Sequence, residues 1–219
     1  MISLAVAMLL ATPRPVVDTY LVEADQDVWV YPHSSDPGGD SFLRVWGLGG
    51  KSVAASAGDA EDFSYSYLRF SFDKVPTDKK LVGAYMFLKP AGTPEIDANA
   101  KSWPLEVRPL KGKFTEKDWA YTQISDVSPS ESEVYGTGVV SAADGPGAEK
   151  AFEIKIDLMG KDSKFSTALS KMLSEKQPMF VALTSKYDVS EMGMKGVYKV
   201  FSKDNKDELI RPRLVLKFE

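Results

Sequence analysis

Two short alternating segments near the N-terminus carry aromatic and basic side chains that could bind a ligand. Residues 28–31 and 41–46 each place aromatic or basic side chains on one face of an extended strand. Aromatic rings offer flat apolar faces for stacking, and an arginine beside them adds planar hydrogen-bond donors. If the two strands pair, these side chains form one aromatic and basic platform, which we predict to be a binding site suited to the ring of a sugar. Its members are Trp29, Tyr31, Arg44 and Trp46.

Arg69 is a further candidate, because it alternates outward between Leu68 and Phe70. Its guanidinium group could hold the carboxylate of a uronic acid through two hydrogen bonds. Each candidate also has a structural interpretation. Arg69 could form an ion pair across the sheet with a neighbouring acid. The aromatic rings could belong to the core, because large aromatic side chains are buried more often than not. The sequence leaves these alternatives open.

Acidic residues gather in two segments that could hold a metal ion. Asp25 and Asp27 lie in one, and Asp59, Glu61 and Asp62 crowd the other. Their hard oxygen ligands suit calcium, although the spacing of an EF-hand is missing. Acidic residues in loops are more often simply solvated. We therefore expect no cofactor, with a structural calcium ion as the alternative.

Groups for catalysis are scarce in this sequence of 219 residues. It has no cysteine, which excludes thiol nucleophiles, disulfides and Cys/His zinc sites. The single histidine, His33, lies in a turn-like segment, so the commonest general base is nearly missing. A net charge of −4, from 27 Lys and Arg against 31 Asp and Glu, argues against a broad basic face for nucleic acid. We expect a protein that is not an enzyme and binds no nucleic acid.

The elements that must position these side chains are strands, because alternation with a period of two dominates the sequence. Each candidate strand has one polar face and is bounded by Gly, Pro, Asp or Ser, which is typical of antiparallel sheets with a solvated side. Residues 47–62 and 125–149 are predicted to be long loops. The predicted strands are 18–22, 28–31, 41–46, 67–72, 84–88, 105–108, 152–158, 179–184, 197–201 and 213–218.

One segment has the period of a helix instead. Its apolar stripe has the spacing i, i+4, i+7 and i+8, Asp162 or Ser163 can cap its start, and Pro178 follows its end. The predicted fold is therefore all-β, an antiparallel jelly-roll β-sandwich with one short helix covering an end, built as a single domain over residues 12–219. The stripe consists of Phe165, Leu169, Met172 and Leu173.

Residues 1–11 form an apolar run that is too short to cross a bilayer, which needs about 20 apolar residues. The run ends in Ala11 and is followed by Thr12 and Pro13, which favours a signal peptide, although no basic residue precedes Arg14. A buried first strand is the alternative. Since no later segment is long and apolar enough to span a membrane, we expect a protein that is secreted or displayed on the cell surface.

The order of short motifs resembles the DNRLRE domain, a family of exported β-sandwich modules also catalogued among carbohydrate-binding modules. The resemblance covers about residues 15–218. The clearest motif is Ser66-Tyr67-Leu68-Arg69-Phe70-Ser71-Phe72 followed by Val75-Pro76, which is similar to the family's "YLRFD…lP" signature. Other matching segments are Pro15-Val16-Val17-Asp18-Thr19-Tyr20-Leu21-Val22, Ser41-Phe42-Leu43-Arg44-Val45, Ala84-Tyr85-Met86-Phe87-Leu88 and Arg211-Pro212-Arg213-Leu214-Val215-Leu216.

The resemblance implies binding of a polysaccharide, with acidic polymers among the ligands. It does not indicate which sugar is bound, and the sequence leaves the oligomeric state open. Two other functions remain as alternatives. One is a structural or adhesive surface module that binds a protein or copies of itself through its long loops. The other is a small polysaccharide lyase, which the scarcity of catalytic groups makes the weaker alternative.

Overall fold

The computed structural model describes residues 16–31, 34–36, 41–53, 63–91, 103–142, 152–186 and 198–219. These residues form a mostly antiparallel β-sheet protein with one α-helix, which confirms the predicted all-β, sandwich-like fold. The predicted signal peptide lies outside the described residues. Within the described ranges, no helix has the length and apolar character that a membrane span requires.

The strands of the larger sheet follow the order β7-β6-β11-β4-β1-β13-β5-β10-β9, with β2 beside β1 and β8 beside β6. A separate sheet pairs β3 with β12. The strands are β1 (Asp18–Tyr31), β2 (Ser34–Asp36), β3 (Phe42–Val45), β4 (Tyr65–Phe70), β5 (Leu81–Leu88), β6 (Leu105–Lys111), β7 (Ser128–Pro129), β8 (Gly136–Gly138), β9 (Val140–Ala142), β10 (Phe152–Asp157), β11 (Met179–Thr184), β12 (Tyr198–Phe201) and β13 (Arg213–Phe218). The helices are α1 (Phe165–Glu175) and the 3-10 turns η2 (Glu116–Asp118), η3 (Tyr121–Ser125) and η6 (Glu208–Ile210).

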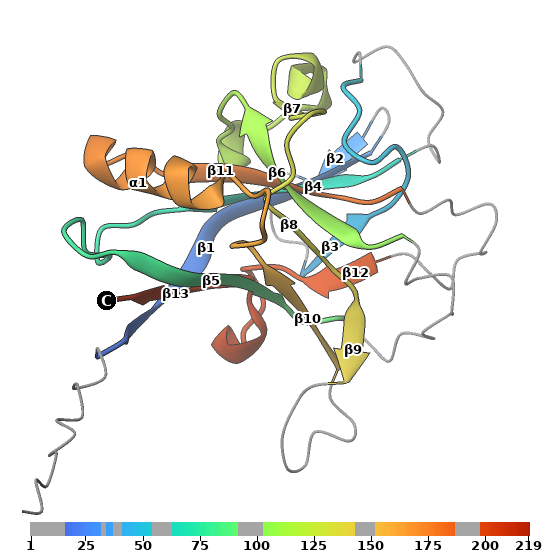
Figure 1. Ribbon diagram of the computed structural model, residues 1–219. Helices are drawn as coiled ribbons and strands as arrows, with labels where there is room; N and C mark the ends of the chain where they lie inside the picture. The colour runs from blue at the N-terminus through green and yellow to red at the C-terminus, as the bar shows by residue number, and fades with distance from the viewer. Residues whose placement is uncertain are drawn as a thin grey trace, which may run out of the picture.

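Strand β1 joins the two layers of the curled sheet, which Figure 1 shows one above the other. Its first half pairs with β13, where Asp18 lies opposite Phe218, and its second half pairs with β4, where Val30 lies opposite Tyr65. The register shifts between Ala24 and Gln26. The sequence predicted two separate strands here, and this is wrong because the polar residues between them are also paired.

The segment that contains β8 and β9 closes the curl between the two layers. Strand β8 pairs with β6, and β9 pairs with β10. Residues 125–149 were predicted to be a loop, yet they contain β7, β8 and β9. Strands of two or three residues are too short to show alternation, so their existence depends on distant pairing partners.

Two hydrophobic cores cover opposite faces of the upper layer. The main core lies between the layers and receives the inward side chains of β5, β10 and β13, such as Met86, Ile156 and Leu216. The second core lies on the other face of β1, β4 and β11, under the segment that carries η2 and η3. Its buried members are Val28, Val30, Phe63, Tyr65, Tyr67, Phe114, Trp119, Tyr121, Ile124, Val127 and Ala182.

Helix α1 covers one side of the main core, as predicted, and β3 with β12 lies toward the other side (Figure 1). Phe165, Leu169 and Leu173 of its apolar stripe are buried in that core. The N-cap residue is Lys164, so neither predicted cap residue occupies that position. The Oγ of Ser163, one residue earlier, still accepts a hydrogen bond from the backbone N–H of Phe165 at 3.1 Å.

Closure of the curl depends on the absence of a side chain at Gly136. A Cβ atom there would lie 2.2 Å from the carbonyl oxygen of Asp157, whereas a Cβ at Gly160 would meet nothing within 4 Å. We expect Gly136→Ala to lower the free energy of unfolding by about 1–3 kcal/mol, because β8 must move away from β10. Urea unfolding measures the loss. Gly160→Ala is the matched control, and an equal effect of both variants would contradict the close packing of β8 on β10.

Candidate functional site

The two strands expected to carry the binding platform do not pair with each other. In its second half β1 pairs with β4 and β2, whereas β3 pairs with β12. The premise of strand pairing is therefore wrong. Alternation shows which side chains share a face, but it does not show which strand lies next to which.

The structure nevertheless brings Trp29 and Arg44 together. The guanidinium carbon of Arg44 lies 4.5 Å from the ring centroid of Trp29, a cation–π contact. Trp29 is only 8% exposed and belongs to the main core. The strand of Arg44 is held by the hydroxyl groups of Ser64 and Ser66, which both donate to its carbonyl oxygen at 2.9 Å. Little of the Trp29 ring is left for a ligand, and its role in binding stays a prediction.

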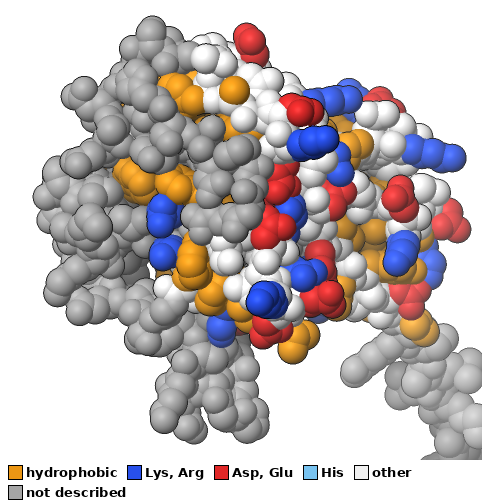
Figure 2. All heavy atoms as spheres, turned by 180° about the vertical axis from the view of Figure 1, so that it is seen from behind, with side chains coloured by type: hydrophobic (Ala, Val, Ile, Leu, Met, Phe, Trp, Pro, Cys, Tyr) orange, Lys and Arg blue, Asp and Glu red, His pale blue; other side chains and the backbone are white. Residues whose placement is uncertain are grey.

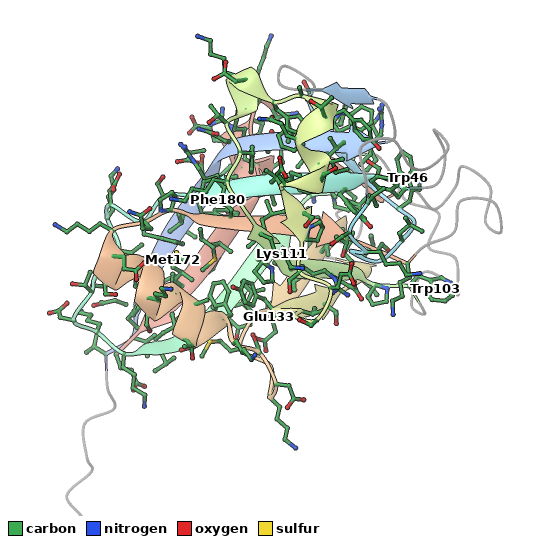
Figure 3. The ribbon with its side chains drawn as sticks, turned by 90° about the horizontal axis from the view of Figure 1, so that it is seen from above. Trp46, Trp103, Lys111, Glu133, Met172 and Phe180 are labelled. Carbon is green, nitrogen blue, oxygen red and sulfur yellow. The ribbon has the colours of Figure 1, made fainter. Side chains whose placement is uncertain are left out.

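A second tryptophan that the sequence analysis missed, Trp103, lies on the same side of the molecule as Trp46 (Figure 3). Both rings are half-buried, and Figure 3 shows Trp46 and Trp103 on the same side of the molecule, away from Met172 on α1. The backbone of Trp46 exchanges two hydrogen bonds with Ser64, and the Ser185 hydroxyl donates to the carbonyl oxygen of Trp103 at 3.3 Å. Trp46 stays a predicted sugar contact. The side chains of Tyr31 and His33 lie outside the described residues.

Arg69 forms the ion pair that was the structural alternative for this residue. Its Nε lies 2.7 Å from Oδ1 of Asp25, and its Nη2 donates to Oδ2 at 3.0 Å. The hydroxyl of Ser71 donates to the same Oδ2 at 2.5 Å. The side chain of Arg69 keeps 27% of its surface exposed, and contact with a ligand stays a prediction for it.

A different group of aromatic and basic side chains lies on the outer face of the lower layer. Tyr85 and Phe87 alternate with buried residues of β5, so they are half-buried and face outward. Cross-strand pairing places Lys155 of β10 and Arg213 of β13 on either side of Phe87. Together with Lys217 these residues form what we call the outer platform: Tyr85, Phe87, Lys155, Arg213 and Lys217.

The cations of the outer platform lie against its rings. The Nζ of Lys155 is 4.7 Å from the centroid of Tyr85, and the Nζ of Lys217 is 5.6 Å from the same ring. The guanidinium carbon of Arg213 is 5.7 Å from the centroid of Phe87. Exposed contacts of this kind contribute about 0.5–1 kcal/mol each. Among the described residues, none of these cations forms an ion pair, which leaves their charges available to a ligand.

The arrangement of the outer platform suits a ligand that is both flat and polar. Carboxylates occupy its margins, because Glu23 lies opposite Arg213 and Asp157 lies opposite Tyr85. Seen from behind, the described surface likewise has hydrophobic side chains among both kinds of charge (Figure 2). The sequence analysis missed this platform, because the register of β10, β5 and β13 joins residues that are far apart in the chain.

A buried carboxyl group on β1 lies between the η2 segment and the turn after β12. Asp27 is only 3% exposed, and its Oδ2 accepts a hydrogen bond from the backbone N–H of Lys203 at 2.7 Å. The Asp27 N–H donates to Glu116, whose other oxygen lies 2.9 Å from the Nζ of Lys203. Burial raises the pKa of Asp27 to about 7, against the opposing effect of the hydrogen bond and charge of Lys203.

Asp27 and Glu116, together with Asp204, form the cluster of described carboxyl groups that could hold a metal ion. Oxygen atoms of Asp27, Glu116 and Asp204 lie within 4.8 Å of one another. Lys203 already places its ammonium group 2.6 Å from Asp204 as well as close to Glu116. A calcium ion would have to displace that ammonium group, so calcium stays a prediction. The other acidic candidates, Asp59, Glu61 and Asp62, lie outside the described residues.

We expect stability to fall as the pH rises from about 4 to 7, because the native state holds the proton of Asp27 longer than the unfolded chain does. The pKa of Asp27 is raised from 3.8 to about 7, which corresponds to a loss on the order of 4 kcal/mol in the free energy of unfolding across this pH range. Asp27→Asn removes this loss while keeping an acceptor for the Lys203 N–H. Urea unfolding at pH 4, 6 and 8 measures it, with exposed Asp118→Asn as the control. An unchanged pH profile in Asp27→Asn would refute the assignment.

Trp29→Ala is expected to lower the free energy of unfolding by about 3 kcal/mol, since it empties a buried site in the main core. Trp46→Ala should cost less, because Trp46 is half-buried. Thermal and urea unfolding of the two variants measure the difference. Equal stability of Trp29→Ala and the wild type would show that this ring is free for a ligand.

No protein-family model matches the sequence, and no curated protein matches it significantly.

Proposed function

We propose that this protein is a non-catalytic, exported carbohydrate-binding module whose ligand lies across the outer platform. The observation that carries the proposal is the pair of outward aromatic rings on β5 with three cations beside them. Aromatic faces stack on apolar sugar surfaces, and the cations donate hydrogen bonds to hydroxyl or carboxylate oxygens. The predicted signal peptide and the resemblance to the DNRLRE domain support the same function.

The spacing of the rings supports an extended ligand. Tyr85 and Phe87 are two residues apart on one strand, which separates their Cα atoms by about 7 Å. A polysaccharide that follows the strand can therefore meet one ring after the other. Because β10, β5 and β13 are already paired around these rings, binding requires no rearrangement of the backbone.

The charges of the platform support an acidic sugar as the first ligand to test. Lys155 and Arg213 flank Phe87 across the sheet, so a carboxylate placed over this ring meets a cation on either side. Hydrogen bonds between ionised groups are about twice as strong as neutral ones. A neutral polysaccharide would use the rings but only part of the donor capacity of these cations.

A protein partner is the second candidate, and one observation favours it. Leu21 on β1 is 69% exposed and lies opposite Val215, which lies opposite Tyr85. This apolar row borders the rings and would suit a protein surface better than a sugar. A structural or adhesive module would use it, and the experiment below distinguishes the two candidates.

We expect Tyr85→Ala and Phe87→Ala each to weaken polysaccharide binding about 5- to 150-fold, because each removes a stacking interaction of about 1–3 kcal/mol. Affinity electrophoresis against uronate polymers and neutral glucans measures the change. Phe42→Ala is the matched control, since Phe42 also lies under a lysine, 4.1 Å from the Nζ of Lys199, but outside the platform. Thermal unfolding verifies that each variant is folded.

Three outcomes would contradict parts of the proposal. If no polysaccharide is retained while Leu21→Asp abolishes self-association or capture of a protein, the protein-partner function replaces it. If Trp46→Ala weakens binding and the platform variants do not, the sugar lies at the originally predicted site. Release of unsaturated products from uronate polymers, seen as rising ultraviolet absorbance, would make the protein a lyase.

A further inference from the structure

A pocket of about 380 Å³ lies between the second half of α1 and the neighbouring ends of β5 and β13. It is separate from the outer platform, and no residue of the platform lines it. Its volume is within the range of small-molecule sites, about 300–1,000 Å³. Its floor is apolar and its rim is polar. The floor is formed by Leu81, Leu169, Leu173 and Phe218, and the rim by Thr77, Lys79, Ser170, Ser174 and Lys176.

The charged groups of the rim are of one sign. Its two charged side chains, Lys79 and Lys176, are both positive, and no carboxylate lines the pocket. Lys79 contacts Asp18, but both side chains are more than one-third exposed, so this ion pair contributes little and its ammonium group can be shared with a ligand. No described carboxylate forms an ion pair with Lys176. This local excess of positive charge occurs in a protein with a net charge of −4.

The end of α1 fixes the backbone of Lys176 at the pocket. Lys176 adopts the left-handed conformation with φ of 52° at the helix C-cap, and its N–H reaches the carbonyl oxygens of Leu173 and Met172. The N–H of Gln177 donates to Met172 at 2.9 Å. These bonds satisfy the last carbonyl groups of the helix. Lys176 carries a full positive charge, which exceeds the roughly half negative charge of a helix C-terminus, and Lys79 shares its charge with Asp18, so the rim keeps a net positive charge that favours an anion.

We propose that this pocket binds an amphiphilic organic anion, with an alkyl or aryl body on the apolar floor and a carboxylate between Lys79 and Lys176. The apolar body would lie against Leu81 and the flank of α1, because Phe218 is only 1% exposed and offers it little surface. The hydroxyl groups of Ser170 and Ser174 already donate to carbonyl groups of the helix, so their oxygens can only accept further bonds. The donors left for the carboxylate are the two ammonium groups and the hydroxyl of Thr77.

Isothermal titration of the full chain with sodium decanoate tests the proposal, with decyltrimethylammonium as the probe of opposite charge. We expect decanoate to bind and decyltrimethylammonium not to bind. Lys176→Glu should weaken decanoate binding about tenfold or more, because it replaces an attractive contact with a repulsive one. Ser170→Trp should abolish it by filling the pocket from the exposed side of α1. Far-ultraviolet circular dichroism and thermal unfolding verify that the variants are folded.

Lys171→Glu is the matched control, because Lys171 is exposed on the same helix but does not line the pocket. It should leave decanoate binding unchanged. If Lys171→Glu and Lys176→Glu weaken decanoate binding equally, the effect comes from the overall charge of the helix and not from the pocket, and the proposal is overturned. Equal binding of both probes, binding that survives Ser170→Trp, or no binding of decanoate at all would overturn it as well. None of these outcomes affects the proposed binding of polysaccharide at the outer platform.

Discussion

The double pairing of β1 is the constraint on which the rest of the structure depends. Its first half forms hydrogen bonds with β13 and its second half with β4, so one strand belongs to both layers of the curled sheet. The register shift near Ala24 and Gln26 lies at the point where the strand passes from one layer to the other. Because both layers share this strand, their inner faces meet and bury a common core.

This arrangement also decides which aromatic side chains a ligand can reach. The upper layer is covered on both faces, since its inner side forms the main core and its outer side lies under the segment with η2 and η3. Trp29 belongs to that layer and is buried. The lower layer has a solvated outer face, and Tyr85 and Phe87 lie on it. Accessibility thus depends on what covers a strand, which the side chains of the strand itself do not reveal.

The buried Asp27 lies where three segments meet, and its carboxyl group is desolvated because these segments cover it. Its backbone and side chain bind the η2 segment and the turn after β12, with Lys203 as the common partner. A carboxyl group in that position joins segments from distant parts of the sequence, but it loses its hydration. The raised pKa is the consequence, since burial disfavours the charged form.

Local patterns in the sequence determined the helix and most of the longer strands, but not the continuity of β1 or the short strands β2, β7, β8 and β9. Strands β11 and β13 begin and end at the predicted residues, and α1 buries three of the four residues of the predicted apolar stripe. These features follow from alternation and backbone chemistry over a few neighbouring residues. Only the tertiary structure decided the strand order, the register that places Lys155 and Arg213 beside Phe87, and the burial of Trp29. Those features depend on contacts between residues far apart in the chain, and such contacts leave no periodic pattern in the sequence of any one strand.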